Sequence, residues 1–336
     1  MKQKDYKRMS LIAPFLTVMD AMLDDRNPFP ARFLHRFSDL EPADLKKLIK
    51  AWPQVSPDRK HTLLDDLEDL AEADRMTSFD DLARTLLADT DPQVRARAIR
   101  LLWECDDAKL VPVYLNFLNN DDNPEVQAAA ANALGQFAYL GELGKIPAEL
   151  HHMIEDQLVA AVTSTKETLV CQRALESLGY SGRKEVVPLI EAASSKKNPG
   201  WMVSALLAMG RSCDKRWKKQ VLSQLRNPDE DIRSEAIHTA GELELESARP
   251  VLLDILEDED EPEVRHELIQ TLSKIGGEGV RSKLEELQEI EEDDEEADFI
   301  EEALEILSLT EDKGSFSLLD VDPEVDFVEE EPDEKE

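Results

Sequence analysis

Glycine and aromatic residues are scarce in this chain of 336 residues. It has 12 glycines, and Phe, Trp and Tyr together make up only 5% of it. With so few helix-breaking glycines and only 17 prolines, long helical runs are possible. The apolar fraction, 41%, is large enough for a hydrophobic core and consists mostly of leucine and alanine.

Cysteine is also rare. Cys105, Cys171 and Cys213 are odd in number and far apart, without a CxxC pair, so the sequence indicates no disulfide framework. This pattern fits a reducing cytoplasm, where we expect the protein to reside. An apolar stretch over residues 11–19 is interrupted by Asp20, which predicts an amphipathic helix rather than a signal peptide. No apolar stretch approaches the length of a membrane-spanning helix, so we expect no membrane partner.

Positive charge is in short supply. The chain has 39 basic and 74 acidic side chains, with a net charge of -35. Residues 289–336 carry 23 of the acidic side chains, and the rest of the chain is still anionic. Nucleic-acid binding depends on Lys and Arg neutralising phosphates, and a field of this sign repels a polyanion. We therefore expect no nucleic acid among the partners.

A short pattern recurs along the chain. A turn residue precedes a proline or its equivalent, and apolar or small residues follow two, six and ten positions later. The segments "DPQVRARAIRLLW" from Asp91, "NPEVQAAAANALG" from Asn123 and "EPEVRHELIQTLS" from Glu261 show the pattern. We refer to the proline-equivalent positions as anchors; they are Pro57, Pro92, Pro124, Thr168, Pro199, Glu230, Pro262 and Ala297.

Each anchor predicts the start of a helix. Asp or Asn before the anchor can cap the helix, and proline is well tolerated at the first helical position. The apolar spacing places one stripe along the helix. Glycines are expected to end these helices by adopting a positive φ. These glycines are Gly135, Gly179, Gly210, Gly241 and Gly276.

A second apolar segment, such as "LVPVYLNFLNN" or "EVVPLIEAASS", precedes each anchored helix, so the repeating unit is a helical hairpin. Most anchors are 31 to 35 residues apart, and one step of 44 residues predicts an inserted loop around "AYLGELGKIPAEL". A lone hairpin buries too little apolar area to offset its chain entropy, whereas stacked hairpins share a core. We predict an all-α solenoid of about eight stacked hairpins over residues 41–307. A helical or extended segment, 1–40, precedes it, and an acidic disordered tail, 308–336, follows.

The D-x-P-x-V-R turn, the proline in the first helix of several hairpins and the step near 32 residues resemble HEAT repeats. The resemblance is strongest to the bacterial HEAT-like repeats of phycobilin lyase-type (PBS lyase) proteins, and it covers roughly residues 41–307. It implies that the second helix of each hairpin, the B helix, lines a concave face.

Two histidine patterns are candidate metal sites. Deoxyhypusine hydroxylases, a HEAT-type family, carry His-Glu pairs on several repeats that together hold two irons. Here only His266, of six histidines, is followed by glutamate, and one pair cannot fill an iron's coordination shell. His151 and His152 precede Glu155 by about one turn, but adjacent histidines are expected to point to different sides of a helix. We therefore predict no metal, no cofactor and no catalytic residue.

Positions five, eight and twelve residues after each anchor should point away from the core stripe. In the middle of the array they hold arginines, amides and a tyrosine, and Arg and Tyr are typical anchors of protein interfaces. We predict that this concave face binds an acidic peptide; a solvated helix face is the alternative. The predicted residues are Arg97, Arg100, Asn132, Gln136, Arg173, Tyr180, Arg211 and His238.

The acidic tail contains apolar residues that a purely solubilising segment would not need. They include Phe316, Leu318, Leu319 and Phe327. Acidic-hydrophobic segments often fold on a partner, so we expect the tail to dock on a second protein or on this chain's own groove, unless it is simply a solvated terminus. The sequence thus predicts a non-catalytic protein-binding scaffold. The alternative is an enzyme or enzyme accessory resembling bilin lyases or metal-dependent hydroxylases.

Overall fold

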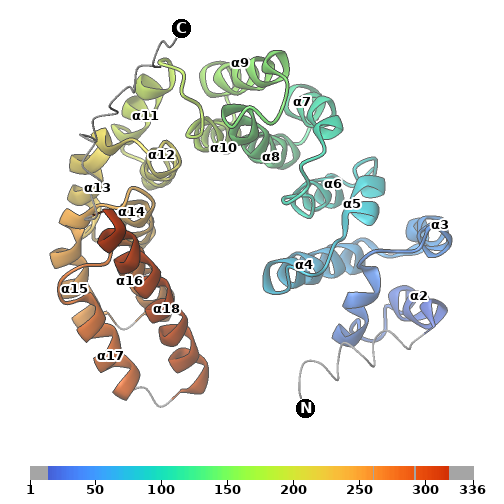
Figure 1. Cartoon of the computed structure of the whole chain (residues 1–336). Coiled ribbons are helices and arrows are strands. Elements are labelled where there is room, and N and C mark those ends of the chain that lie inside the picture. The colour runs from blue at the N-terminus through green and yellow to red at the C-terminus, as the bar shows by residue number, and fades with distance from the viewer. Residues whose placement is uncertain (1–13, 260, 291–292, 318–336) are drawn as a thin grey trace, which may run out of the picture. The chain divides into compact units, whose positions relative to one another are not determined.

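The computed structural model describes residues 14–259, 261–290 and 293–317, and all regular elements in these ranges are helical (Figure 1). The chain divides into two compact units, Met1–Ser212 (unit 1) and Cys213–Glu336 (unit 2). None of the helices in the described ranges combines the length and apolar character needed to cross a bilayer.

Unit 1 opens with α2 (Phe15–Leu23) and the 3-10 helix η1 (Ala31–Phe37), which are followed by α3 (Pro42–Ala51) and η2 (Trp52–Gln54). Three phenylalanines form a buried cluster here, with the Phe37 ring centroid 6.3 Å from that of Phe15 and 5.9 Å from that of Phe29. The cluster supplies an apolar core to the segment before the first anchored helix.

The rest of unit 1 consists of two layers of helices, which Figure 1 shows alternating along the chain. The B helices pack side by side, and each one after the first, α4 (Pro57–Ala73), also packs on the A helix that precedes it. The B helices are α4, α6 (Pro92–Arg100), α8 (Pro124–Glu142), α10 (Thr168–Leu178) and α12 (Pro199–Arg211). The A helices after α3 are α5 (Asp80–Leu86), α7 (Val111–Asn120), α9 (Ala148–Ser164) and α11 (Val186–Ser194), with η3 (Ala108–Leu110) before α7.

Unit 2 repeats this arrangement. Its A helices are α13 (Lys218–Gln224), α15 (Arg249–Asp258) and α17 (Val280–Ile290), with η4 (Lys215–Trp217) and η5 (Glu246–Ala248) before the first two. Its B helices are α14 (Glu230–Glu242), α16 (Pro262–Ile275) and α18 (Asp294–Ser317). In chain order the described helices from α3 to α18 make eight A–B pairs, which confirms the predicted all-α hairpin array.

The predicted helix starts are confirmed almost residue for residue. Seven of the eight anchors are the first residue of a B helix, and α18 begins at Asp294 rather than Ala297. The residue before the anchor caps the helix as expected: the side chains of Asp91, Asn123 and Asn198 each accept a hydrogen bond from a backbone N–H of the first turn. Local chemistry therefore positions each hairpin in the chain.

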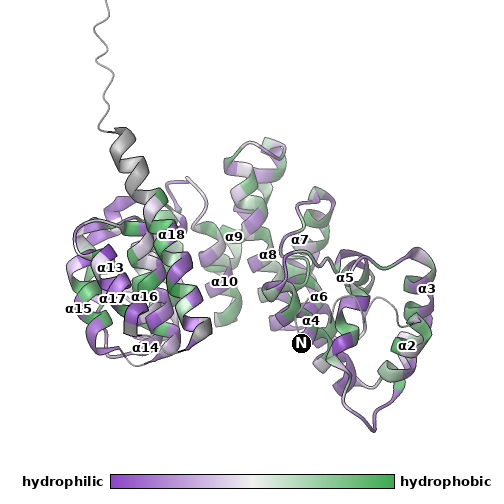
Figure 2. Cartoon of the chain, turned by 60° about the horizontal axis from the view of Figure 1, so that its bottom comes forward, coloured by the Kyte–Doolittle hydropathy of each residue, from purple (hydrophilic) through white to green (hydrophobic). Residues whose placement is uncertain are grey.

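The core of each unit lies between its two layers. Figure 2 shows hydrophobic and hydrophilic residues alternating along the helices, as amphipathic helices require. Tyr114 of α7 and Phe137 of α8 are each 1% exposed, and their ring centroids are 6.2 Å apart. Such A–B contacts bury the apolar area that a single hairpin could not.

The predicted inserted loop is wrong. The extra residues lengthen two helices instead, because α8 has 19 residues and α9 has 17, and only residues 143–147 connect them. Gly135 was expected to end α8, yet it lies inside that helix. The alanine-rich sequence before Gly135 favours the helix, and a single internal glycine costs only about 1 kcal/mol, so the helix continues through it.

The predicted role of the glycines is also wrong for most of them. Only Gly276 ends a helix with a positive φ, at 61°. Three others allow neighbouring B helices to approach closely. A Cβ at Gly135 would lie 2.7 Å from Ser177 Oγ, one at Gly179 2.7 Å from the Ala208 carbonyl oxygen, and one at Gly241 3.0 Å from Thr271 Oγ1. The fifth, Gly210, lies inside α12.

Helix α18 continues to Ser317, so residues 308–317 of the predicted disordered tail are helical. Phe316 therefore belongs to this helix. Leu318, Leu319 and Phe327, the other apolar tail residues named above, lie outside the described residues.

Candidate functional site

Seven of the eight predicted binding residues belong to unit 1. They lie on or just after its B helices: Arg97 and Arg100 on α6, Asn132 and Gln136 on α8, Arg173 on α10, Tyr180 two residues beyond α10, and Arg211 at the end of α12. The eighth, His238, is on α14 of unit 2.

Two of the predicted arginines join neighbouring B helices. Arg97 Nε lies 2.5 Å from Asp65 Oδ1, and Arg100 Nε lies 2.9 Å from Glu68 Oε2; both carboxylates are on α4. Each pair spans 32 residues, which is one repeat. Part of the charge that the sequence assigned to partner binding is therefore used within the stack.

Arg173 serves a buried carboxylate. Its Nη1 lies 2.6 Å from Glu176 Oε2, and the Glu176 side chain is only 2% exposed. Ser204 of α12 donates a hydrogen bond to the other carboxylate oxygen at 2.7 Å. Because an unpaired buried charge is costly, Arg173 and Ser204 together stabilise the packing of α10 against α12.

The B-helix face of unit 1 contains two adjoining hollows, of about 430 Å³ and about 570 Å³, which we call the groove. Asn132 of α8 lines both. The first hollow is lined by Arg100, Glu125, Ala128, Ala129, Asn132, Leu169 and Arg173. The second is lined by Trp103, Glu104, Asn132, Ala133, Gln136, Tyr139, Tyr180 and Arg211.

The second hollow is rich in accessible aromatic surface. Trp103 and Tyr139 are each 47% exposed, and the ring centroids of Tyr139 and Tyr180 are 5.3 Å apart. The Arg211 guanidinium lies 5.0 Å from the centre of the Tyr180 ring. Among the described residues, no carboxylate lies within ion-pair distance of Arg211, so its charge faces the hollow.

Of the aromatic and cationic residues that line the second hollow, the sequence-based prediction included Tyr180 and Arg211 but not Trp103 and Tyr139. Tyr139 was assigned to the inserted loop, because α8 was expected to end at Gly135. Trp103 stands where other repeats have glycine, and that departure from the pattern is the signal that could have identified it.

In unit 2, His238 bridges two B helices. Its Nδ1 lies 3.0 Å from Glu267 Oε1 on α16. This hydrogen bond raises the pKa of His238, against the opposing effect of burial, and the charges of Glu267, Glu235 and Glu242 act in the same direction as the bond. His238 therefore links α14 to α16 and is not a free binding residue.

We predict that replacing His238 with glutamine lowers the stability of unit 2 more at about pH 5.5 than at about pH 8.5. A histidine whose pKa is raised by folding contributes stability that is fully present below its unfolded pKa and is lost as the pH rises through the folded value. Trp217 is the one tryptophan in unit 2, so ¹⁹F NMR of the fluorotryptophan-labelled protein during urea unfolding can follow its signal apart from those of the three tryptophans in unit 1. An equal loss at both pH values would contradict the prediction.

The dipeptide His266-Glu267 does not converge on one point. The His266 ring lies against Phe299, with centroids 4.3 Å apart, and its Nε2 contacts the Glu296 carboxylate. Glu267 is directed instead to His238, on the neighbouring B helix. The pair therefore links α16 to two different helices.

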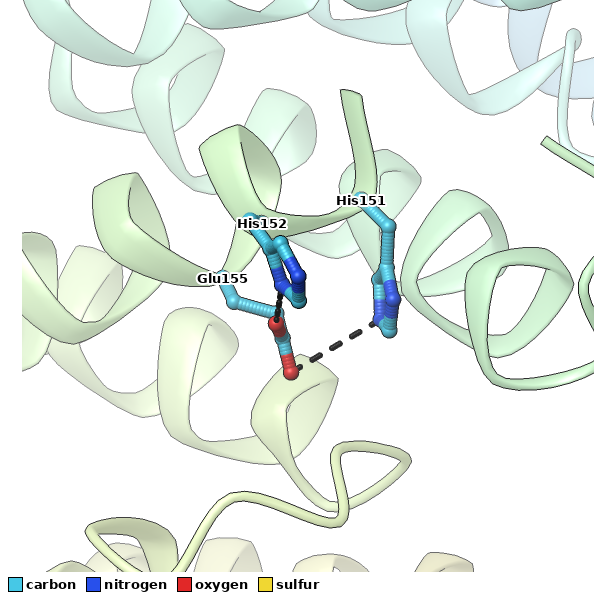
Figure 3. Close-up of side chains that lie close together, drawn as sticks. All are labelled: His151, His152 and Glu155. Atoms are coloured by element: carbon cyan, nitrogen blue, oxygen red, sulfur yellow. Dashed lines mark hydrogen bonds and ion pairs between the residues drawn. The ribbon is translucent and has the colours of Figure 1, made fainter. Parts of the chain in front are cut away.

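His151, His152 and Glu155 do converge, as Figure 3 shows. The two imidazoles are stacked, with centroids 5.8 Å apart and planes at 20°. The expectation that they point to different sides of the helix is wrong. Helical side chains lean toward the N-terminus, so Glu155 reaches back to the residues three and four positions earlier. Within the described ranges, this is the one group of three or more His, Cys, Asp or Glu whose donor atoms could share a metal ion.

A family model agrees with this architecture. The family model of HEAT repeats matches residues 79–149 and 218–307. Among solved structures, the chain is similar to the Escherichia coli protein YibA, at 17% identity over 85% of this chain and 99% of that one, with a TM-score of 0.43. It is also similar to the CpcE–CpcF complex of phycocyanin lyase from Nostoc sp., at 16% identity over 68% and 94% of the two chains, with a TM-score of 0.46.

Human deoxyhypusine hydroxylase is a further similar structure, at 20% identity over 92% of this chain and 98% of that one, with a TM-score of 0.31. No curated protein matches the chain. At such identities and TM-scores, neither the activity nor the partners of these proteins transfer to this chain.

Proposed function

The chain is a HEAT-repeat protein, and from this premise we propose that it acts as a protein-binding scaffold. Its groove on unit 1 takes an acidic segment of a partner protein that also carries aromatic or other large apolar side chains. The role is to hold the partner rather than to transform it.

The observation that carries the proposal is the exposed aromatic and cationic end of the groove. Trp103 and Tyr139 offer large apolar surfaces to solvent, and burying such surfaces is the main source of binding energy at hot spots. Arg211, held over the Tyr180 ring, can form a charge-assisted hydrogen bond with an incoming carboxylate. Aromatic contacts would thus provide affinity, and the arginine would select for acidic sequence.

The lining of the groove supports binding without catalysis. Among its residues in both hollows there is no Ser, Thr, Cys, His or Lys. These are the most common nucleophiles and acid–base catalysts after carboxylates, and the two carboxylates of the lining, Glu125 and Glu104, belong to different hollows. The carboxylates and arginines present here suit recognition better than bond cleavage.

The chain itself contains a segment of the required chemistry. Residues 308–336 combine many acidic side chains with Phe316, Leu318, Leu319 and Phe327. A synthetic peptide of residues 308–336 is therefore a suitable probe of the groove.

We predict that this peptide binds the full-length protein, and that Trp103→Ala or Tyr180→Ala weakens binding at least about 30-fold, the effect of losing a hot-spot side chain. Arg211→Gln should weaken binding and reduce its dependence on salt. Fluorescence anisotropy of the labelled peptide measures all three effects. Met153→Ala is the matched control, because Met153 is 50% exposed on α9 and does not line the groove.

The proposal would be refuted if the peptide bound neither the full-length wild type nor a full-length form carrying both Phe316→Ala and Phe327→Ala. It would also be refuted if Met153→Ala weakened peptide binding as much as the groove substitutions do. Tighter peptide binding to the doubly substituted form would instead identify the chain's own tail as a competing occupant. That result distinguishes docking of the chain's own tail from a groove that is free for a second protein.

A further inference from the structure

We propose that His151, His152 and Glu155 form a binding site for a divalent transition-metal ion of the zinc class. The site lies on α9, an A helix, and its residues do not line the groove, so it does not depend on the proposed scaffold function. Two imidazoles and one carboxylate are a ligand set that zinc accepts, and a three-ligand site leaves one coordination position for a further group.

The donor atoms already lie close to coordination geometry. Zinc bonds of about 2.0–2.1 Å in a tetrahedron place neighbouring donor atoms about 3.3 Å apart. Glu155 Oε1 lies 3.7 Å from His151 Nε2, and Glu155 Oε2 lies 3.2 Å from His152 Nδ1. The donor atoms of the three residues all lie within 4.8 Å of one another. The remaining adjustment falls on His152, whose side chain is 71% exposed and can rotate freely.

A second observation, the burial of His151, also points to a ligand. This residue is only 9% exposed, and its Nε2 is buried without a hydrogen-bond partner among the described residues. A buried ring nitrogen without a partner costs free energy, and a metal ion would satisfy it. The helix packing makes room for this ring, because a Cβ at Gly141 of α8 would lie 2.3 Å from the imidazole.

The surroundings supply the supporting contacts that metal sites use. Ser181 donates its hydroxyl hydrogen to Glu155 Oε1 and so orients a carboxylate that is 2% exposed. Glu142 Oε1 lies 3.8 Å from His151 Nε2 and accepts the Gly182 backbone N–H at 2.7 Å. Glu142 can thus serve as the fourth ligand or balance the charge of the bound ion.

A simple ion pair explains less of this arrangement. One histidine is enough to form an ion pair with a carboxylate, as His238 does with the partly exposed Glu267 in unit 2. Here two stacked imidazoles share one carboxylate, and the buried nitrogen of His151 is still 3.7 Å from it, too far for a hydrogen bond. A shared cation accounts for both features.

The test is isothermal titration calorimetry of the full-length, chelator-treated and tag-free protein with Zn²⁺, repeated with Co²⁺ for its visible absorption. We expect one ion bound per chain. His152→Ala, at an exposed position that leaves the fold intact, should weaken Zn²⁺ binding at least about 100-fold, and Ser181→Ala should weaken it about 10-fold. His238→Ala is the matched control, because it removes a histidine from a His–Glu pair outside the three-residue group.

Unchanged Zn²⁺ affinity in His152→Ala would overturn the proposal. So would the absence of a 1:1 transition in the wild type, or an equal loss of affinity in His238→Ala. Far-UV circular dichroism of each variant checks that its helices are intact, so that a loss of affinity reports on the ligands themselves.

Discussion

Replacing Phe137 with alanine is expected to lower the free energy of unfolding of unit 1 by about 3–5 kcal/mol. Phe137 is 1% exposed in the middle of α8 and packs against Tyr114 of α7. The substitution removes a ring's worth of buried apolar area and leaves a cavity that two long, well-packed helices cannot collapse to fill.

Urea unfolding followed by circular dichroism measures this loss, and amide hydrogen exchange in α7 and α8 locates it. Tyr139→Ala is the control, because it removes a ring of similar size from an exposed position on the same helix. We expect Tyr139→Ala to change stability far less. If the two variants were equally destabilised, the A–B interface would not be the core of this hairpin.

Replacing Gly179 with valine is expected to destabilise unit 1 by about 3 kcal/mol, the upper end of the usual cost of overpacking. A Cβ at this position would lie 2.7 Å from the Ala208 carbonyl oxygen and 2.8 Å from the Ala208 Cα. These are backbone atoms of α12, so the clash can be relieved only by moving that helix away from α10. The φ of Gly179 is -53°, so the backbone conformation itself would not resist a side chain.

Gly182→Val serves as the matched control for Gly179. Gly182 is exposed three residues later, and a Cβ there would meet only the Glu142 side chain, at 3.5 Å or more. The denaturation midpoints of the two variants should therefore differ clearly, with Gly182→Val near the wild type. A Gly179→Val protein as stable as Gly182→Val would show that α10 and α12 do not need their close contact.

The arrangement of the hairpins along the chain could be predicted because its causes are local. A cap such as Asn123, a proline immediately after it and an apolar stripe act within one or two helical turns, so they can be recognised without knowing what the helix packs against. Where the cause was not local, prediction failed. Gly135 was assigned to a helix end, but its role is to let α8 approach Ser177 of α10.

The candidate site was predicted only in part for the same reason. Periodicity placed Arg97 and Arg100 on the B-helix face, but it could not show that Asp65 and Glu68, one repeat earlier, already pair with them. Tyr139 became a groove residue only once α8 proved to continue beyond Gly135. The convergence of His151 and His152 on Glu155 depends on side-chain rotamers, which a residue count along the helix does not describe.

The sequence by itself determined that this protein is an array of helical hairpins, and it determined the first residue of seven of the eight B helices. Its negative net charge also disfavours binding to nucleic acid. Helix caps and the spacing of apolar residues act over a few residues, and the net charge is a sum over the composition, so neither depends on the tertiary structure. The tertiary structure alone decided which arginines remain available to a partner, which aromatic side chains reach the groove, and which histidines meet a carboxylate. Those outcomes depend on contacts between helices about one repeat apart, and such contacts exist only once neighbouring hairpins have packed.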